Sequence, residues 1–170
     1  MPQLTPEENY KVPSVDFMFR EDGEFVTRSS EELFSGKKVV LFALPGAFTP
    51  TCSSYQLPGY EAFYDMFVEA GVDEVYCLSV NDAFVMNAWA RDLGIKNVKM
   101  IPDGCGTFTR SMGMLVNKPA QGFGMRSWRY SAVIDNMNVV QLNVEPGLNN
   151  SSADDDPYVE STPEKILGQL

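Results

Sequence analysis

One short stretch of the sequence, PGAFTPTCS from Pro45 to Ser53, combines residues that could do chemistry. Its cysteine, Cys52, can act as a nucleophile once the thiol has lost its proton. Thr49-Pro50 is typical of a helix start, because a threonine N-cap accepts amide hydrogen bonds and a proline at the first helical position has no N–H to lose. We therefore expect Cys52 in the first turn of a helix, where free backbone N–H groups and the helix dipole favour the thiolate. The stretch predicts an anion site that holds a cysteine.

The cysteine and histidine counts restrict the chemistry further. The chain has three cysteines, Cys52, Cys77 and Cys105, without a C-x-x-C pair, and it has no histidine. These counts exclude a disulfide scaffold, a zinc site, a thioredoxin dithiol, histidine-dependent hydrolases and histidine-ligated haem. We expect neither a metal nor a cofactor. Cys52 must then be activated by the helix end, by backbone amides, or by an arginine or lysine.

Length and charge bound the class of protein. With 170 residues and 44% hydrophobic content, the chain suits one buried core, so we expect a single domain over 1–170. It has no apolar run of about 18 residues and no basic-then-apolar start, which predicts a soluble, cytoplasmic protein. The net charge of −10 disfavours nucleic acid and anionic membranes as partners.

The elements around Cys52 begin with a strand. Residues 39–44 form a continuous apolar run, typical of a central strand buried on both faces, and Pro45-Gly46 ends it. The helix that begins at Thr49-Pro50 should continue to Gly71, with a kink or interruption at Pro58-Gly59. Local opening at that weak point would help if the sulfur must leave its pocket.

The rest of the chain continues an α/β pattern. A strand over 75–80 and a helix from Asn81 or Asp82 to about Leu93 complete a βαβ unit, whose strands should be parallel. The remaining expected elements are a hairpin over 15–20 and 24–28, a helical turn at 29–32, a strand over 98–101, a short helix near 107–112, a hairpin over 129–134 and 139–144, a polar loop over 149–156 and a last helix from Thr162. We expect an α/β, thioredoxin-like fold, with a mixed central sheet, flanking helices and an N-terminal extension.

The spacing of Pro45, Thr49 and Cys52 resembles the active-site signature P-x-x-x-T-x-x-C of the peroxiredoxins. Longer blocks resemble the peroxiredoxin-5, or type II, subfamily: LPGY from 57, GVDEVYCLSVNDAFVMNAW from 71, PDGCGTFT from 102 and GFGMRSWRYS from 122. These blocks cover nearly the whole chain in order. The resemblance implies a thiol peroxidase that reduces hydrogen peroxide and organic hydroperoxides through a thiolate and a sulfenic acid at Cys52. It also implies a homodimer packed near the active-site face.

The resemblance also assigns roles to side chains. Thr49 would hydrogen-bond the peroxide and the sulfur, although from the residues alone its hydroxyl could be only a helix cap. Pro45 would shield the thiolate from water. Arg129 would favour the thiolate and donate to the peroxide, with Arg126 as its competitor, although a strand arginine is more often solvated or ion-paired. The expected substrate-binding residues are Gly46, Thr51 and Cys52.

Several positions depart from the family pattern or leave the mechanism open. Gln56 stands where many relatives have histidine, so an acid–base role there is in doubt. Cys105 is read as incidental. Cys77 aligns with the second cysteine of plant-type relatives but falls in an expected buried strand, so it is a possible resolving cysteine only. We expect one-cysteine chemistry with glutathione and glutaredoxin, related to the peroxiredoxin–glutaredoxin hybrids; the alternatives are a Cys52–Cys77 disulfide reduced by thioredoxin, and a peroxide-sensing protein.

Overall fold

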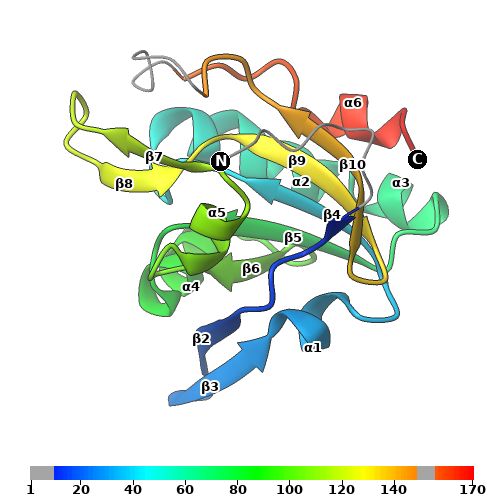
Figure 1. Ribbon diagram of the computed structural model, residues 1–170, viewed down its shortest axis with the longest axis horizontal. Helices are drawn as coiled ribbons and strands as arrows, with labels where there is room; N and C mark the ends of the chain where they lie inside the picture. The colour runs from blue at the N-terminus through cyan, green and yellow to red at the C-terminus, as the bar shows by residue number, and fades with distance from the viewer. Residues whose placement is uncertain (1–9, 149–155) are drawn as a thin grey trace.

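A six-stranded mixed sheet forms the centre of the computed structural model, which describes residues 10–148 and 156–170 (Figure 1). The strands lie in the order β1-β10-β9-β4-β5-β6. Their bounds are Tyr10–Lys11 for β1, Asn138–Val144 for β10, Tyr130–Asp135 for β9, Lys38–Ala43 for β4, Glu74–Ser79 for β5 and Lys99–Pro102 for β6. β4, β5 and β6 run parallel, and the pairs β4–β9, β9–β10 and β10–β1 are antiparallel.

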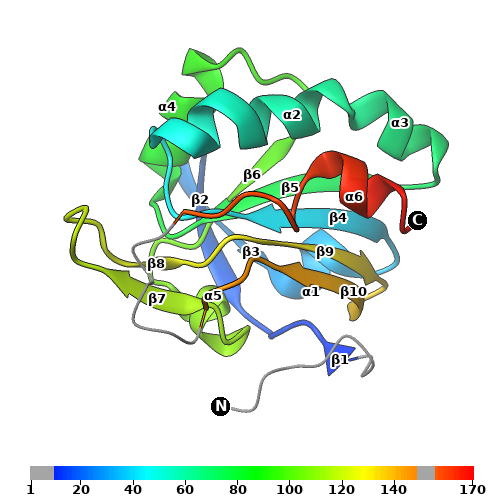
Figure 2. The ribbon, with the colours of Figure 1, turned by 90° about the horizontal axis from the view of Figure 1, so that it is seen from above.

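Helices cover both faces of this sheet, and each face has its own core (Figure 2). One core packs alternate residues of β4, such as Val40 and Phe42, against α2 (Leu57–Ala62), α3 (Tyr64–Glu69), α4 (Ala83–Asp92) and α6 (Pro163–Leu167). The other packs Leu41 and its neighbours against α1 (Ser30–Phe34) and α5 (Thr107–Ser111). Because β4 is buried on both faces, its apolar run is continuous rather than alternating.

Most expected elements are present. The first hairpin consists of β2 (Asp16–Glu21) and β3 (Glu24–Ser29), and Asp22 and Gly23 turn it with positive φ angles of 50° and 78°. Asp82, one of the two expected caps of α4, accepts a hydrogen bond from the Val85 amide at 2.9 Å. Thr162 caps α6 by accepting from the Lys165 amide at 3.3 Å. The expected loop over 149–156 lies outside the described residues except for its last one.

The helix after Cys52 differs from its expected form. The chain is helical from Pro50, but residues Cys52–Gln56 form a wide π-type turn in which the Leu57 amide donates to the Cys52 carbonyl. Pro58 then lies in the first turn of α2, and the helix breaks at Phe63 rather than at Pro58-Gly59. Pro58 has no N–H to donate to the carbonyl four residues earlier. That carbonyl lies within the π-type turn, so the irregular hydrogen bonding falls where the proline leaves a carbonyl without its usual donor.

Three further differences concern strands. A second hairpin, β7 (Leu115–Lys118) and β8 (Gly124–Ser127), was not expected and forms a separate two-stranded sheet. β1 pairs with β10 in the N-terminal extension, for which no strand was expected. The strand expected from Arg129 begins one residue later, so Arg129 lies just before β9. Among the described residues, no helix has the length and apolar character that crossing a membrane requires.

Candidate active site

Cys52 lies at the end of the sheet, on the core side of its helix. β4 leads through the loop that begins at Pro45 into the turn Cys52–Gln56, and the Cys52 side chain is 1% exposed. It packs in the same core as Phe42 and Tyr60. The next residue, Ser53, accepts a hydrogen bond from Nε1 of Trp89 at 2.9 Å, which ties the turn to α4. The sulfur is therefore buried, and the turn that carries it is anchored to α4.

Arg129 reaches Cys52 from a strand far along the chain. β9 lies antiparallel beside β4, with Tyr130 opposite Ala43, so the residue before Tyr130 lies where β4 leads into the Cys52 loop. Nη1 of Arg129 lies 3.4 Å from Sγ of Cys52. The arginine side chain is also 1% exposed, so a permanently charged guanidinium lies directly beside the buried sulfur.

Three further side chains contact the Arg129 guanidinium. Nη1 also donates to Oε1 of Gln56, and Nη2 donates to the Asp156 carboxylate. The ring of Tyr158 lies 5.6 Å from Cζ of Arg129. Burial by itself lowers the pKa of Arg129, but the charges of Cys52 and Asp156 outweigh it, so its pKa is raised above the usual value. Nε of Arg129 is buried and has no partner among the described residues, which leaves one donor for another oxygen.

The loop between β4 and Cys52 is fixed from two sides. The hydroxyl of Thr49 donates to the Gly46 carbonyl at 2.7 Å. Among the described residues no amide donates to this hydroxyl, so the expected side-chain cap by Thr49 is absent. The Ala47 amide donates to Oδ1 of Asn81 at 3.0 Å. Pro45 and Gly46 are buried, whereas Phe48 is exposed in the left-handed region at φ 65°. Thr49 is half-buried and keeps its lone pairs for a donor from another molecule.

Arg126 does not contact Cys52 but packs against the loop. A side chain at Gly46 would place its Cβ 2.9 Å from Nη1 of Arg126 and 3.2 Å from Cγ2 of Thr49. Nε of Arg126 donates to the Phe123 carbonyl at 3.1 Å. Of the two arginines, Arg129 is the one that contacts the sulfur, and a side chain at position 46 would require the end of the Arg126 side chain to move.

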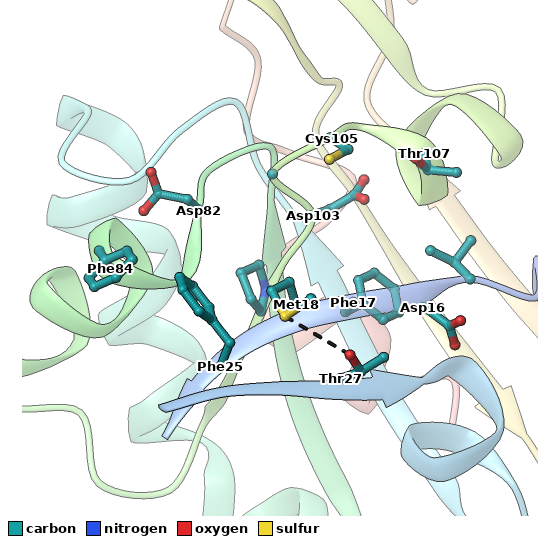
Figure 3. Close-up of a pocket in the computed structure, with 14 residues that line it drawn as sticks. Asp16, Phe17, Met18, Phe25, Thr27, Asp82, Phe84, Asp103, Cys105 and Thr107 are labelled. Atoms are coloured by element: carbon teal, nitrogen blue, oxygen red, sulfur yellow. Dashed lines mark hydrogen bonds between the residues drawn. The ribbon is translucent and has the colours of Figure 1, made fainter. Parts of the chain in front are cut away.

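The other two cysteines lie in very different surroundings. Cys77 is fully buried on β5, opposite Phe42 and in the same core as Cys52. Burial, followed by the charge of Cys52, raises the pKa of Cys77 well above its usual value. Cys105 is exposed and lines a separate pocket of about 610 Å³ between the β2–β3 hairpin and the loop after β6 (Figure 3). Neither Cys52 nor Arg129 lines that pocket.

The sequence and the structure were compared with known proteins. Residues 7–156 match the Redoxin family model. The chain is 53% identical over 169 residues to peroxiredoxin y4vD of Sinorhizobium fredii, and the match covers 94% of this chain and 89% of the relative. The chain belongs to the peroxiredoxin family. It is also 46% identical over 163 residues to the hybrid peroxiredoxin hyPrx5 of Haemophilus influenzae, across 96% of this chain and 66% of the relative.

A solved structure agrees with these matches. The antioxidant protein of Plasmodium falciparum, described as a 1-Cys peroxiredoxin, superposes with a TM-score of 0.87 at 40% identity and covers 94% of this chain and 95% of that chain. As a peroxiredoxin, the protein is a thiol-dependent peroxidase. The predictions of the family, of its type II subfamily and of a thioredoxin-like fold are confirmed.

In this peroxiredoxin, the residues singled out from the sequence gather around one loop. Pro45, Gly46, Thr49 and Thr51 all lie between β4 and Cys52. Sequence reasoning missed three contacts: the acceptor Gln56, and the partners of Arg129 in the last part of the chain, Asp156 and Tyr158. Gln56 stood out only as a departure from the family, and Asp156 only as the end of the polar loop expected over 149–156. Asn81 was expected as a possible helix cap, but it anchors the loop.

Proposed function

We propose that Cys52 is the residue that reduces the peroxide, with hydrogen peroxide and organic hydroperoxides as substrates. The thiolate attacks one peroxide oxygen, and the O–O bond breaks as the S–O bond forms. The product at Cys52 is a sulfenic acid, and the departing oxygen takes a proton and leaves as water or an alcohol. The observation that carries this proposal is the 3.4 Å contact between Nη1 of Arg129 and Sγ of Cys52 in a buried site.

The surrounding residues fit the needs of that reaction. The charge of Arg129 favours the thiolate, and its unpartnered Nε–H can donate to the oxygen on which charge develops. The Thr49 hydroxyl donates to the Gly46 carbonyl, so its lone pairs can accept the peroxide O–H. Buried Pro45 offers no donor and excludes water from the sulfur. Gly46 and Thr51 would line the substrate position through the loop backbone.

The experiment for this proposal is single-turnover oxidation by hydrogen peroxide, which needs no reductant. We expect Cys52→Ser to abolish the fast phase, while Cys77→Ser and Cys105→Ser keep it. A fast phase that survives in Cys52→Ser would assign the chemistry to another residue. Steady-state turnover with an added thiol then distinguishes an enzyme from a peroxide sensor, since a sensor would oxidise rapidly but turn over slowly.

We further propose that the Cys52 sulfenic acid is reduced from outside, by glutathione together with a glutaredoxin. Cys77 is fully buried within β5, and burial raises its pKa, so little of it is thiolate at neutral pH. The similar antioxidant protein of Plasmodium falciparum is described as a 1-Cys peroxiredoxin, which supports the same chemistry here. With peroxide and excess glutathione, we expect a mixed disulfide on Cys52 and full turnover in Cys77→Ser.

A second candidate is a Cys52–Cys77 disulfide that thioredoxin reduces. Both sulfurs belong to one core, and the π-type turn at Cys52 is an irregular piece of helix that could unwind. Mass spectrometry after one equivalent of peroxide separates the two mechanisms. Quantitative formation of the internal disulfide, with turnover lost in Cys77→Ser, would establish this second candidate in place of the first.

We also propose a cytoplasmic homodimer of single-domain chains that packs through the active-site face. Phe48 is 53% exposed in the Cys52 loop, and Met125 is 51% exposed beside Arg126, which itself packs against that loop. Exposed apolar side chains mark contact surfaces where they form one contiguous patch, as we propose for these two. Phe48→Asn should shift the protein toward monomer in analytical sedimentation. Asparagine suits the test because it tolerates the left-handed backbone at position 48. An unchanged dimer would place the interface elsewhere.

A further inference from the structure

A buried carboxylate close to the active site is not explained by the chemistry above. Glu145 follows β10 and is 1% exposed, and its own amide donates to the Arg129 carbonyl at 3.2 Å. Among the described residues, no cation pairs with its carboxylate. Burying an unpaired carboxylate is costly unless several donors surround it. The Glu145 carboxylate must therefore be stabilised by hydrogen-bond donors.

Glu145 holds the segment before α6. Its Oε1 accepts from the amides of Val159 and Glu160 at 2.8 and 2.9 Å. Its Oε2 accepts from the Glu160 amide at 2.9 Å, and from the amide and the hydroxyl of Ser161 at 2.8 and 2.6 Å. One carboxylate thus gathers three consecutive backbone amides. We call residues 156–161 the C-terminal strap.

The strap is fastened a second time, to the helix that follows Cys52. The hydroxyl of Tyr60 on α2 donates to the Ser161 carbonyl at 2.6 Å, and the Tyr60 ring stacks on Phe42 of β4 at 3.8 Å. Figure 2 shows the strap, coloured orange to red before α6, passing between α2 and the sheet. Residues 159–161 of the strap are therefore held by both Glu145 and α2.

The first residues of the strap lie against Arg129. Asp156 accepts from Nη2 of Arg129, and the Tyr158 ring lies 5.6 Å from the guanidinium carbon. Glu145 therefore contacts the arginine twice: directly at its backbone, and through the strap at its side chain. A guanidinium held on both edges keeps one orientation toward the sulfur, and such orientation costs no reorganisation when the substrate reacts.

We propose that Glu145 is a positioning residue for peroxide reduction, which fixes the strap so that Asp156 and Tyr158 orient the Arg129 guanidinium. The proposal rests on the role of Arg129 proposed above. Glu145→Gln replaces an acceptor of several amides by a group that also donates, which leaves buried amides unpaired and releases the strap. Asp156→Asn keeps the shape of the contact but removes its charge. Asp156 is 43% exposed, so this variant is expected to fold.

The test compares two reactions of Cys52 in single turnover: oxidation by hydrogen peroxide, and alkylation by uncharged chloroacetamide. We expect Glu145→Gln to lower the peroxide rate constant about tenfold to a hundredfold, because a misoriented catalytic group costs up to that much. The alkylation rate constant should change much less, so the ratio of the two falls. Asp156→Asn should lower the same ratio, and the double variant should fall no further than Glu145→Gln alone, since both act through one unit.

Glu160→Gln is the matched control, because the Glu160 carboxylate belongs to the strap but pairs with Lys165 instead of Arg129. It should leave both rates unchanged. If Glu145 has only a structural role, Glu145→Gln should lower the melting temperature but leave the ratio of peroxide to alkylation rate constants at its parent value. That result would overturn the proposal, and so would an unchanged ratio in Asp156→Asn. If Arg129→Lys also kept the parent peroxide rate, the role of Arg129 itself would be wrong. If Arg129→Lys were slow while Glu145→Gln and Asp156→Asn were normal, only the strap inference would fail.

Discussion

Replacing Arg129 by lysine separates the charge of the guanidinium from its shape. At the 3.4 Å that separates Nη1 from the sulfur, two unit charges interact by about 5 kcal/mol if the effective dielectric constant is about 20. A lysine ammonium keeps much of that attraction, so the thiolate should still form. It loses the planar fork that reaches Cys52, Gln56 and Asp156 together, and it loses the free Nε–H.

The lost donor fixes the expected size of the effect. Removing one preorganised donor from a developing oxyanion costs roughly 100- to 1,000-fold in rate. We expect Arg129→Lys to lower the rate constant for hydrogen peroxide by about that factor. Stopped-flow tryptophan fluorescence is a suitable assay, because Trp89 donates to Ser53 beside Cys52 and should report the oxidation.

Arg126→Lys is the matched control for this experiment. Arg126 packs against Gly46 and does not contact the sulfur, so its replacement should change the rate much less. The reverse order, with Arg126→Lys slow and Arg129→Lys near the parent rate, would refute the reasoning and move the catalytic arginine to position 126.

Three further predictions concern the surroundings of the site. Gln56→Ala leaves a buried Arg129 donor without its acceptor, so we expect a loss of about 1–3 kcal/mol in the free energy of unfolding and a slower peroxide reaction; unchanged denaturant midpoints and rates would contradict this. Gly46→Ala should slow the peroxide reaction, because the new Cβ crowds Arg126 at 2.9 Å, and Arg126→Ala in the same chain should restore part of the rate; no recovery would mean that the crowding is not the cause. Burial raises the pKa of Cys77 above the value of about 8.5 that the thiol has in the unfolded chain, so the buried thiol stabilises the fold fully below that pH and less as the pH rises above it. In urea titrations from neutral to alkaline pH, the free energy of unfolding should therefore fall less steeply with pH in Cys77→Ala than in the parent. Equal slopes in the two proteins would contradict the argument.

Local patterns predicted most of the fold, because its signals are local. The apolar run of β4, the turn at Asp22-Gly23 and the caps Asp82 and Thr162 each depend on residues within a few positions. The β7–β8 hairpin was missed because its strands are only four residues each and carry Gly124 and Lys118 within them. Such short, mixed strands form only when the neighbouring elements provide a surface.

The site could be predicted only in part for the same reason. Cys52 and Thr49 lie in one motif, and Arg129 was found through the family resemblance and not through its pattern. The contacts of Arg129 with Gln56 and Asp156 join residues that are 73 and 27 positions away, and no local signal links them. The hydroxyl of Thr49 was expected to accept an amide bond, but it donates to the carbonyl of Gly46 in the loop before the helix.

The central claim is that Cys52 carries the oxidation, and one labelling experiment tests it most directly. The protein is mixed with one equivalent of hydrogen peroxide in the presence of dimedone, which traps sulfenic acids, and the labelled peptide is identified by mass spectrometry. The account predicts one dimedone adduct per chain, on Cys52, and the same adduct in Cys77→Ser. An adduct on Cys77 or Cys105, or peroxide consumed at the parent rate by Cys52→Ser, would contradict it.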